Sequence, residues 1–370
     1  MILSNTAAAR ALVSPGDDTR LREVFARARR GEPITLAAIG GSITAGARAT
    51  QPENRYVTRL AGWWLTAFPD SPLKLVNAGI GATGSNYGAL RLQRDVLSKN
   101  PDLVIVDFAV NDLNDPAGRA ESYEGVIRQL LAHRPQPPAV VLVFFLRNDG
   151  ANAQQTQIET GRHYQVPMIS IRDAVWPEIT AGRLTWNDYA ADYVHPNDAG
   201  HALIARRLIE HFERVQIPAS PAFTPPSLLP APLHSNLFQD VTLHESSELY
   251  PVSNNGWVFD TETKAWIGRH PGDTIEFEIT GIAVFLMDYH KNGGFGRASV
   301  QVDSLPPVTR ETWYEQTWGG YRDTVTIARD LSPGPHRIKL KILPDHHSES
   351  GGHEFRLLGL GAANPLSGEP

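Results

Sequence analysis

The chain has 370 residues, of which 41% are hydrophobic and 20% are charged, an ordinary composition for a globular protein. At about 100–200 residues per domain, this length predicts two domains. The formal net charge of -6, with no basic run, argues against a broad, nonspecific attraction to nucleic acid. Because the chain has no cysteine, disulfides, thiolate metal sites and a cysteine nucleophile are all excluded.

The N-terminal 18 residues lack the basic start and long apolar stretch of a secretory leader. No window approaches the ~18–20 uninterrupted apolar residues that a membrane-spanning helix needs. We therefore expect a cytoplasmic protein without a membrane span, or a secreted one if a leader has been trimmed from the sequence.

Between residues 34 and 214, short apolar runs alternate with amphipathic stretches. The near-continuous apolar runs are typical of parallel strands buried on both faces, and the amphipathic stretches have helical spacing. Repeated strand-then-helix units predict a three-layer α/β/α sandwich with a parallel sheet, in a domain of residues 1–217. In chain order, the predicted elements are a strand at 34–39, a helix at 55–68, a strand at 73–76, a helix at 87–97, a strand at 103–110, a helix at 123–132, a strand at 139–145, a helix at 153–164, a shorter strand at 166–171 and a helix at 199–212.

Residues 218–233 form a proline-rich segment, which includes the pair Pro225-Pro226. Proline lacks an N–H group and restricts the residue before it, so this segment is predicted to be a stiff, extended linker. Beyond it, in residues 234–370, short strand-like runs are separated by Gly, Pro and Asp turns. This pattern predicts an antiparallel, jelly-roll-like β-sandwich, with strands at 274–280, 283–288, 298–302, 323–327, 337–342 and 355–360.

The first predicted strand leads directly into Gly40-Gly41-Ser42-Ile43-Thr44. Ligands of α/β sheets bind outside the carboxyl ends of strands, and glycines there let backbone N–H groups approach a reacting atom. The alternative is a tight turn with a capping serine. The segment is neither the G-x-S-x-G turn of α/β-hydrolases, because position 44 is Thr, nor a phosphate-binding loop.

A second segment, residues 77–84, contains glycines at positions 79, 81 and 84 and so matches G-x-G-x-x-G between a strand and a helix. A dinucleotide site also needs an acidic residue about 20 positions later, at the end of the next strand. Asp102 and Asp107 lie before or inside that strand and Asp112 lies farther along. A lone glycine pattern is weak support, and we expect no cofactor.

Two polar groups follow later elements. Asn111 ends the third predicted strand, where it could cap a turn or donate its amide to a developing oxyanion. Asp192 and His195 lie three residues apart before the last predicted helix. A carboxylate in that position can hold the imidazole's tautomer and stabilise its charged form, although such a pair is often exposed on the surface and has no functional role. Taken together, Ser42 supplies a nucleophile, His195 a base and Asp192 its orienting group, with Gly81 and Asn111 as oxyanion donors.

In all four of these blocks the sequence resembles the SGNH/GDSL hydrolase superfamily. AAIGGSITAG resembles the nucleophile block, VNAGIGATGS the glycine block, VDFAVND the Asn-Asp block and DYVHPNDAGH the final Asp-x-x-His block. The resemblance implies the three-layer fold, hydrolysis by a Ser-His-Asp triad, and Gly and Asn as oxyanion donors. In the glycine block an ungapped count places Ala82, rather than Gly81, at the family's donor position. The donor is a backbone N–H, and we assign it to Gly81.

The order of catalytic domain, linker and β-sandwich is similar to that of bacterial carbohydrate acetylesterases with a carbohydrate-binding-like module. Trp313 and Trp318 lie in the loop-like segment 311–320, where aromatic rings could stack on sugars, although tryptophan is more often part of a core. His346, His347 and His353 lie in a Gly/Ser-rich segment and are interpreted as a solvated turn, not a metal site.

The sequence therefore predicts a serine esterase that removes short acyl groups, above all acetyl, from a carbohydrate. Its partner would be a small-molecule or oligosaccharide ester, with no nucleic acid and no membrane. The oligomeric state stays open. A general carboxylesterase or thioesterase is the nearest alternative, and a dinucleotide-binding oxidoreductase and a noncatalytic sugar-binding protein remain as alternatives from other classes.

Overall fold

The computed structural model describes residues 3–216 and 229–366, which fall into two compact units, Met1–Asn236 and Leu237–Pro370. Most of the predicted linker, up to position 228, lies outside the described residues. The end of that segment is fastened to the first unit by a carboxylate. The side chain of Glu124 accepts the N–H groups of Leu233, His234 and Ser235 at 2.6–2.9 Å, so these residues belong to the first unit.

The first unit is built on a six-stranded sheet with the order β1-β6-β5-β4-β2-β3. The strands β2 to β6 are parallel, and β1 pairs antiparallel with β6. The chain therefore goes from β2 outward to β3 and then returns to the other side of β2 as β4, so the strand order reverses between β2 and β4. The strands are β1 (Leu12–Ser14), β2 (Ile34–Gly40), β3 (Leu73–Gly79), β4 (Leu103–Asp107), β5 (Ala139–Phe144) and β6 (Met168–Ser170).

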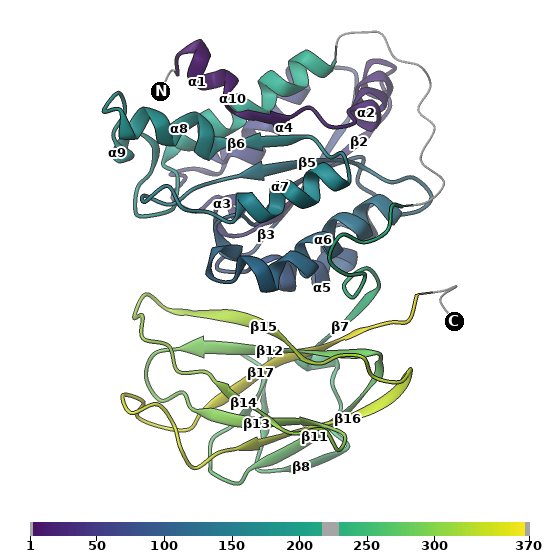
Figure 1. Ribbon diagram of the computed structural model, residues 1–370, viewed down its shortest axis with the longest axis vertical. Coiled ribbons are helices and arrows are strands. Elements are labelled where there is room, and N and C mark those ends of the chain that lie inside the picture. The colour runs from purple at the N-terminus through teal and green to yellow at the C-terminus, as the bar shows by residue number, and fades with distance from the viewer. Residues whose placement is uncertain (1–2, 217–228, 367–370) are drawn as a thin grey trace. The chain divides into compact units, whose positions relative to one another are not determined.

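Helices cover both faces of this sheet, which confirms the predicted three layers (Figure 1). The helices α4 and α10 lie on one face, and α5, α6 and α7 lie on the other. In the described part of the chain, no helix has the length and apolarity required to cross a bilayer. The helices are α1 (Asn5–Ala9), α2 (Thr19–Arg29), α3 (Ser42–Ala45), α4 (Tyr56–Ala67), α5 (Ser85–Asp95), α6 (Pro116–Ala132), α7 (Gln154–His163), α8 (Ile171–Thr180), α9 (Trp186–Tyr189) and α10 (Asp198–Val215), with short 3-10 turns η1 (Pro52–Asn54), η2 (Leu97–Lys99) and η3 (Asn111–Asn114).

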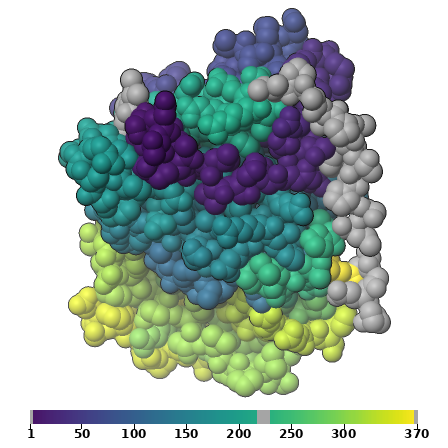
Figure 2. Space-filling view, turned by 45° about the horizontal axis from the view of Figure 1, so that its top comes forward, coloured from purple at the N-terminus to yellow at the C-terminus, as the bar shows by residue number. Residues whose placement is uncertain are grey.

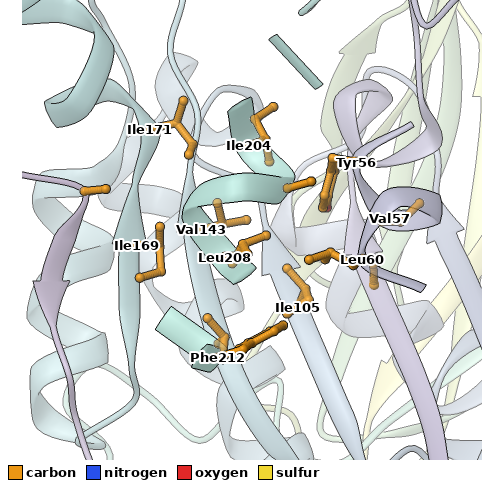
Figure 3. Close-up of a cluster of buried hydrophobic side chains, with 14 of the residues drawn as sticks. Tyr56, Val57, Leu60, Ile105, Val143, Ile169, Ile171, Ile204, Leu208 and Phe212 are labelled. Atoms are coloured by element: carbon orange, nitrogen blue, oxygen red, sulfur yellow. The ribbon is translucent and has the colours of Figure 1, made fainter. Parts of the chain in front are cut away.

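The core between the sheet and α4 and α10 explains why the strands read as continuous apolar runs. Alternate residues of each strand face this layer, such as Ile105 of β4 and Val143 of β5, which meet Leu60 and Leu208 from the helices (Figure 3). The intervening residues, such as Val106, are also fully buried, on the opposite face. Both faces of the strands are therefore apolar, as is typical of a parallel sheet covered on two sides.

The N-terminal segment, for which the sequence predicted no element, closes one edge of the sheet. Strand β1 pairs with β6, and the side chain of Arg10 bonds Glu178 of α8. In the space-filling view the purple N-terminal residues lie at the surface of this unit, beside the teal residues of its later helices (Figure 2).

The second unit is a sandwich of two antiparallel sheets, as predicted. One sheet has the order β15-β12-β17-β10-β9, with β7 also paired to β17, and the other has the order β14-β13-β16-β11-β8. Their inner faces share one apolar core, which includes Phe277, Leu340 and Leu357. The strands are β7 (Val241–Glu245), β8 (Ser253–Asn255), β9 (Val258–Asp260), β10 (Ala265–Gly268), β11 (Thr274–Gly281), β12 (Ala283–Lys291), β13 (Arg297–Val302), β14 (Val308–Glu311), β15 (Gly320–Ala328), β16 (Gly334–Ile342) and β17 (Phe355–Ala363), with a 3-10 turn η4 (Ser246–Glu248).

Candidate active site

The carboxyl ends of β2, β3 and β4 lie side by side and bring three of the predicted segments together. Gly40, the last residue of β2, is in register with Gly79 of β3 and with Asp107 of β4. In open α/β sheets, ligands bind where the strand order reverses, and here that point lies between β2 and β4.

Ser42 is the first residue of the short helix α3, and Gly41 before it has an extended backbone. The glycine at position 41 is required by a close neighbour, because a Cβ there would lie 2.1 Å from the side-chain oxygen of Asn111. Position 41 must therefore be glycine for the Asn111 amide to lie beside the serine turn.

His195 connects Ser42 to Asp192. Its Nε2 lies 2.8 Å from the Ser42 Oγ, and its Nδ1 lies 3.0 and 2.9 Å from the two carboxylate oxygens of Asp192. Because the carboxylate can only accept at Nδ1, that nitrogen carries the proton and Nε2 is free to accept the serine hydroxyl proton. The three side chains form one continuous hydrogen-bonded chain.

The loop that carries Asp192 and His195 is fastened on several sides. The Asp192 carboxylate accepts the N–H groups of Val194 and His195 at 3.0 and 2.8 Å. The backbone N–H of Ala191 donates to the carbonyl of His195, and the Trp186 indole donates to the carbonyl of Asp192. These local bonds fix the imidazole's direction, and the N–H of Asn148, which donates to the carbonyl of Tyr193, also holds the loop.

Partial burial raises the pKa of Asp192, but several hydrogen bonds outweigh this effect and hold the pKa well below its usual range. The donors are the N–H and ring of His195, the N–H of Val194 and the guanidinium of Arg48, whose Nε lies 2.9 Å from the second carboxylate oxygen. Asp192 is therefore an anion beside His195 across the neutral pH range.

Gly81 and Asn111 both lie next to Ser42. A Cβ on Gly81 would lie 3.8 Å from the Ser42 Cβ, and the Asn111 amide lies against Gly41, as described above. Asn111 begins η3, directly beyond β4. The N–H of Ser42 itself is at the first position of α3, where backbone N–H groups have no partner within the helix. Three potential hydrogen-bond donors thus lie in or beside the turn that carries Ser42.

The dinucleotide alternative is not supported by the way its glycines are used. A Cβ on Gly79 would lie 2.1 Å from the backbone nitrogen of Ala45, and one on Gly84 would lie 2.6 Å from the Asp112 carboxylate. Both positions therefore serve close internal packing, and Gly81 faces Ser42. Asp112 itself is buried and accepts the N–H of Ser85, at the start of α5.

The sequence did not single out Arg48, Trp186 or Thr44 for this site. Arg48 comes into contact with Asp192 only through the fold. Trp186 lies six residues before Asp192, but no residue pattern marks its contact. Thr44 is visible in the nucleophile block, but nothing in the sequence predicts the buried partners of its hydroxyl.

Trp313 and Trp318 belong to the second unit. The Trp313 ring stacks on His347, with ring centroids 3.8 Å apart and planes at 4°. Trp318 is 56% exposed and contacts the rings of Tyr314 and Tyr321. These two residues are therefore in different surroundings, one stacked on a histidine and one open to solvent.

The second unit also holds a cluster with the composition of a cation site, formed by Asp288, His290 and Asp323. The guanidinium of Arg310 lies among these groups, 2.8 Å from Asp288 and 2.9 Å from Asp323. Because the guanidinium supplies the positive charge, we interpret the cluster as an ion network. It joins β14 of one sheet to β12 and β15 of the other.

Comparison with known proteins also indicates an esterase. Residues 38–203 match the model of the GDSL-like lipase/acylhydrolase family. An acetylxylan esterase of Geobacillus stearothermophilus is 25% identical over 206 residues, which cover 47% of this chain and 91% of that protein.

Two solved structures match both units. A two-domain esterase (CEX) active on acetylated mannans is 30% identical with a TM-score of 0.88, over 97% of this chain and 99% of that one. The same kind of esterase co-crystallised with mannopentaose is also 30% identical, with a TM-score of 0.87, over 98% and 99% of the two chains. The superfamily resemblance inferred from the four blocks is thus confirmed, and the chain belongs to the GDSL-like lipase/acylhydrolase family.

Proposed function

We propose that the first unit is a serine esterase in which Ser42, His195 and Asp192 act as the catalytic triad. The observation that carries the proposal is the hydrogen-bonded chain from the Ser42 Oγ through His195 to Asp192, with distances of 2.8 and 2.9 Å. This is the arrangement that a weak hydroxyl nucleophile requires, namely a base within reach and a third group that orients the base.

In the first half of the reaction, the Ser42 Oγ bonds to the ester carbonyl carbon as His195 Nε2 takes the hydroxyl proton. The resulting imidazolium is stabilised by Asp192. When the tetrahedral intermediate collapses, the bond to the alcohol oxygen breaks and His195 donates its proton to that oxygen. In the second half, His195 takes a proton from water as the water oxygen bonds to the acyl carbon. When this second intermediate collapses, the bond between the acyl carbon and the Ser42 Oγ breaks, and His195 donates the proton it took from water to that Oγ. The carboxylic acid leaves, and the free serine hydroxyl and neutral His195 are restored.

The carbonyl oxygen becomes negative in both tetrahedral intermediates. We assign its stabilisation to the N–H of Ser42, the N–H of Gly81 and the side-chain amide of Asn111. Donors held in place before the reaction are most effective, because they need no reorganisation as the charge develops. The close contact of Asn111 with Gly41 supports this assignment.

The substrate we propose is an acetylated carbohydrate. The support comes from the relatives, one named an acetylxylan esterase and another described as a two-domain esterase active on acetylated mannans. The second of these matches nearly the whole chain, including the β-sandwich, and has been crystallised with mannopentaose, so an acetylated mannan is our first choice. The location in the cytoplasm stays a prediction.

For the second unit we propose that Trp318 and Trp313 bind sugar rings. We expect the smaller contribution from Trp313, because its ring is already stacked on His347. The exposed indole of Trp318 is supported by two neighbouring tyrosine rings, an arrangement that suits stacking on the apolar face of a sugar.

The test is the release of acetate from acetylated mannooligosaccharides, acetylated xylooligosaccharides and p-nitrophenyl acetate, each with the full chain and with Ser42→Ala. We expect activity on all three that is lost in Ser42→Ala, because a triad acts as a unit. A folded Ser42→Ala protein with activity within tenfold of the wild type would refute the triad. Activity on p-nitrophenyl acetate alone would refute the carbohydrate substrate and leave a general carboxylesterase.

A further inference from the structure

A buried carboxyl group lies beneath the turn that carries Ser42. Asp107, the last residue of β4, is in register with Gly40 and is 2% exposed. Its carboxyl group accepts the hydroxyl of Thr44 at 2.9 Å and also the N–H of Gly41. Asp107 therefore holds the chain on both sides of Ser42, one residue before it and two residues after it.

Thr44 is the second part of this arrangement. Its side chain is fully buried, and its Oγ1 lies 2.9 Å from the hydroxyl of Tyr56 at the start of α4. A hydroxyl has one proton to donate. When the Thr44 hydroxyl donates to Asp107, it can only accept from the Tyr56 hydroxyl. Tyr56, Thr44 and Asp107 thus form one buried hydrogen-bonded chain.

The backbone around Thr44 has little room to move. The Asn77 amide donates to the carbonyl of Thr44 at 2.9 Å. A Cβ on Gly40 would lie 2.5 Å from both the Thr44 Oγ1 and the Asp107 carbonyl. The turn is therefore held by the Asn77 amide from β3, by the buried carboxyl of Asp107 from β4 and by the close approach of β2.

These contacts serve a site in which the position of one hydroxyl decides the rate. A displacement of about 1 Å can cost a catalytic group roughly 10²-fold in rate. We infer that Thr44 and Asp107 are positioning residues of the esterase: they fix the turn so that the Ser42 hydroxyl stays on His195 while the Ser42 N–H stays in place for the oxyanion. This inference rests on the proposed function.

The charge of Asp107 adds a second consequence. Burial raises the pKa of Asp107 to about 8, and the Asp112 carboxyl in η3 raises it as well, against the lowering effect of the hydrogen bonds from Thr44 and Gly41. The other titratable groups that interact with it are the phenols of Tyr56 in α4, Tyr123 in α6 and Tyr189 in α9, and Arg119 faces Asp112. At neutral pH the carboxyl is mostly neutral. Above pH 8 it becomes an anion near the developing oxyanion, and the rate should fall.

The experiment measures kcat and KM for p-nitrophenyl acetate from pH 6 to 9.5, together with thermal unfolding, for four variants of the full chain. Thr44→Val removes the hydroxyl at constant size, and Thr44→Ser restores it. Asp107→Asn keeps a hydrogen-bond acceptor but cannot ionise. Thr160→Val, which removes another fully buried threonine hydroxyl in the same unit, is the matched control.

We expect Thr44→Val to lower kcat by roughly 10–100-fold with KM changed less than about threefold, and Thr44→Ser to recover most of the loss. Thr160→Val should leave kcat as in the wild type. Asp107→Asn should lower kcat at pH 7 by only a few-fold and should abolish the decline that the wild type shows above pH 8.

The inference is overturned if folded Thr44→Val keeps the kcat of Thr160→Val, or if only its KM rises. If Thr44→Val does not fold, Asp107→Asn decides: a folded Asp107→Asn protein that has the kcat of Thr160→Val at pH 7 and keeps the wild-type decline above pH 8 overturns the inference. A wild-type chain without Ser42-dependent hydrolysis would instead overturn the proposed function, so the two failures are distinct.

Discussion

At the scale of single residues, some side chains of the proposed site can be recognised from the sequence around them, whereas others reach the site only through the fold. Asn111 belongs to the first group. Its place shortly after β4 follows from the sequence, and its contact with Gly41 follows from the register of β4 with β2. Arg48 belongs to the second group, because it is 144 residues away from Asp192 along the chain.

Replacing Asn111 by alanine should lower kcat by roughly 10²–10³-fold, the usual loss for one oxyanion donor. The amide acts mainly in the transition state, where the carbonyl oxygen is negative, so KM should change little. Steady-state kinetics with p-nitrophenyl acetate check this. A rise in KM with unchanged kcat would make Asn111 a ground-state binding residue and would remove it from the oxyanion site.

Arg48→Gln tests the ion pair on the Asp192 carboxylate. The pair is exposed, and exposed pairs contribute about 0–1 kcal/mol, which corresponds to at most about a fivefold fall in kcat/KM. Asp192 keeps its bonds to His195 and Val194, so the triad should stay assembled. Arg206→Gln on α10 is a matched control, because Arg206 is 57% exposed and Arg48 61%, and each donates a hydrogen bond to a carboxylate; Arg206 also lies 3.9 Å from Glu213. A loss well beyond tenfold, specific to Arg48→Gln, would mean that the guanidinium also contacts the substrate.

Trp318→Ala should raise KM for acetylated mannooligosaccharides by roughly 3–10-fold, because one aromatic stacking contact contributes about 0.5–1.5 kcal/mol. Hydrolysis of p-nitrophenyl acetate, which has no sugar, should change less than twofold. Tyr250→Ala removes another highly exposed aromatic side chain of the same unit and should have no effect on either substrate. Equal effects of the two variants on the oligosaccharide would argue against a binding role for Trp318.

The sequence indicated those residues of the proposed site that lie in short, contiguous motifs. Asp192 and His195 lie in one loop, and Ser42, Gly81 and Asn111 each follow a strand whose apolar run is easy to recognise. The structure brings all five together. Thr44, Asp107 and Arg48 could not be assigned in this way, because their roles depend on distances across the sheet and on burial, which neither residue type nor spacing determines.

At the scale of elements, the long apolar strands were predictable, whereas several short strands were not, among them the buried β10. The strands β2, β4 and β5 are apolar on both faces, so their runs stand out against the helices. By contrast, β8 (Ser253–Asn255) is exposed and polar throughout, and β1 has only three residues. Helix α2 buries Leu21, Val24 and Phe25 at helical spacing, but its many charged residues conceal that stripe.

Arg310 shows how an element that the sequence did not predict can matter. It lies on β14, and its bonds to Asp288 of β12 and Asp323 of β15 connect the two sheets of the sandwich. Arg310→Met should lower the free energy of unfolding of this unit by about 3–5 kcal/mol, because it leaves the buried carboxylate of Asp288 and the partly buried one of Asp323 without their guanidinium. Arg337→Met, which removes an exposed arginine paired with Glu278, should cost at most about 1 kcal/mol. Equal unfolding midpoints for the two variants in denaturant would contradict the assignment.

The same network predicts a pH dependence with a definite sign. Burial raises the pKa of Asp288, but the charge of Arg310 and the bond from His290 outweigh it, and the pKa lies below its ordinary value. A carboxyl whose pKa is lowered on folding contributes stability above its unfolded pKa, about 3.9 for aspartate, and loses it as the pH falls through the folded pKa. The difference in the free energy of unfolding between wild type and Arg310→Met should therefore be largest at pH 6–7 and should become smaller below pH 4.

At the scale of the whole molecule, the proposed catalytic residues all belong to the first unit, and each unit has a hydrophobic core of its own. Residues 1–236 should therefore fold alone and hydrolyse p-nitrophenyl acetate with a kcat within about tenfold of the full chain.

The boundary chosen for this fragment should affect its stability, because a boundary at residue 217, as the sequence predicted, removes Leu233, His234 and Ser235. Burial raises the pKa of Glu124, but the N–H groups of these three residues and the Tyr164 hydroxyl outweigh this effect and lower it. Removal of the three N–H donors therefore leaves a buried carboxylate with few hydrogen-bond donors.

Residues 1–217 should accordingly be less stable than residues 1–236 by about 1–3 kcal/mol or more, the cost of an unsatisfied buried group that carries charge. Glu124→Gln in the longer fragment should reproduce much of this loss, and the same substitution in the shorter fragment should have little further effect. Glu159→Gln on the exposed side of α7 serves as the control in both. Thermal unfolding of the six proteins, the two fragments and their variants, checks the argument. Equal stability of the unsubstituted fragments would show that residues 229–236 do not stabilise the first unit, and an unfolded 1–236 would show that this unit depends on the second.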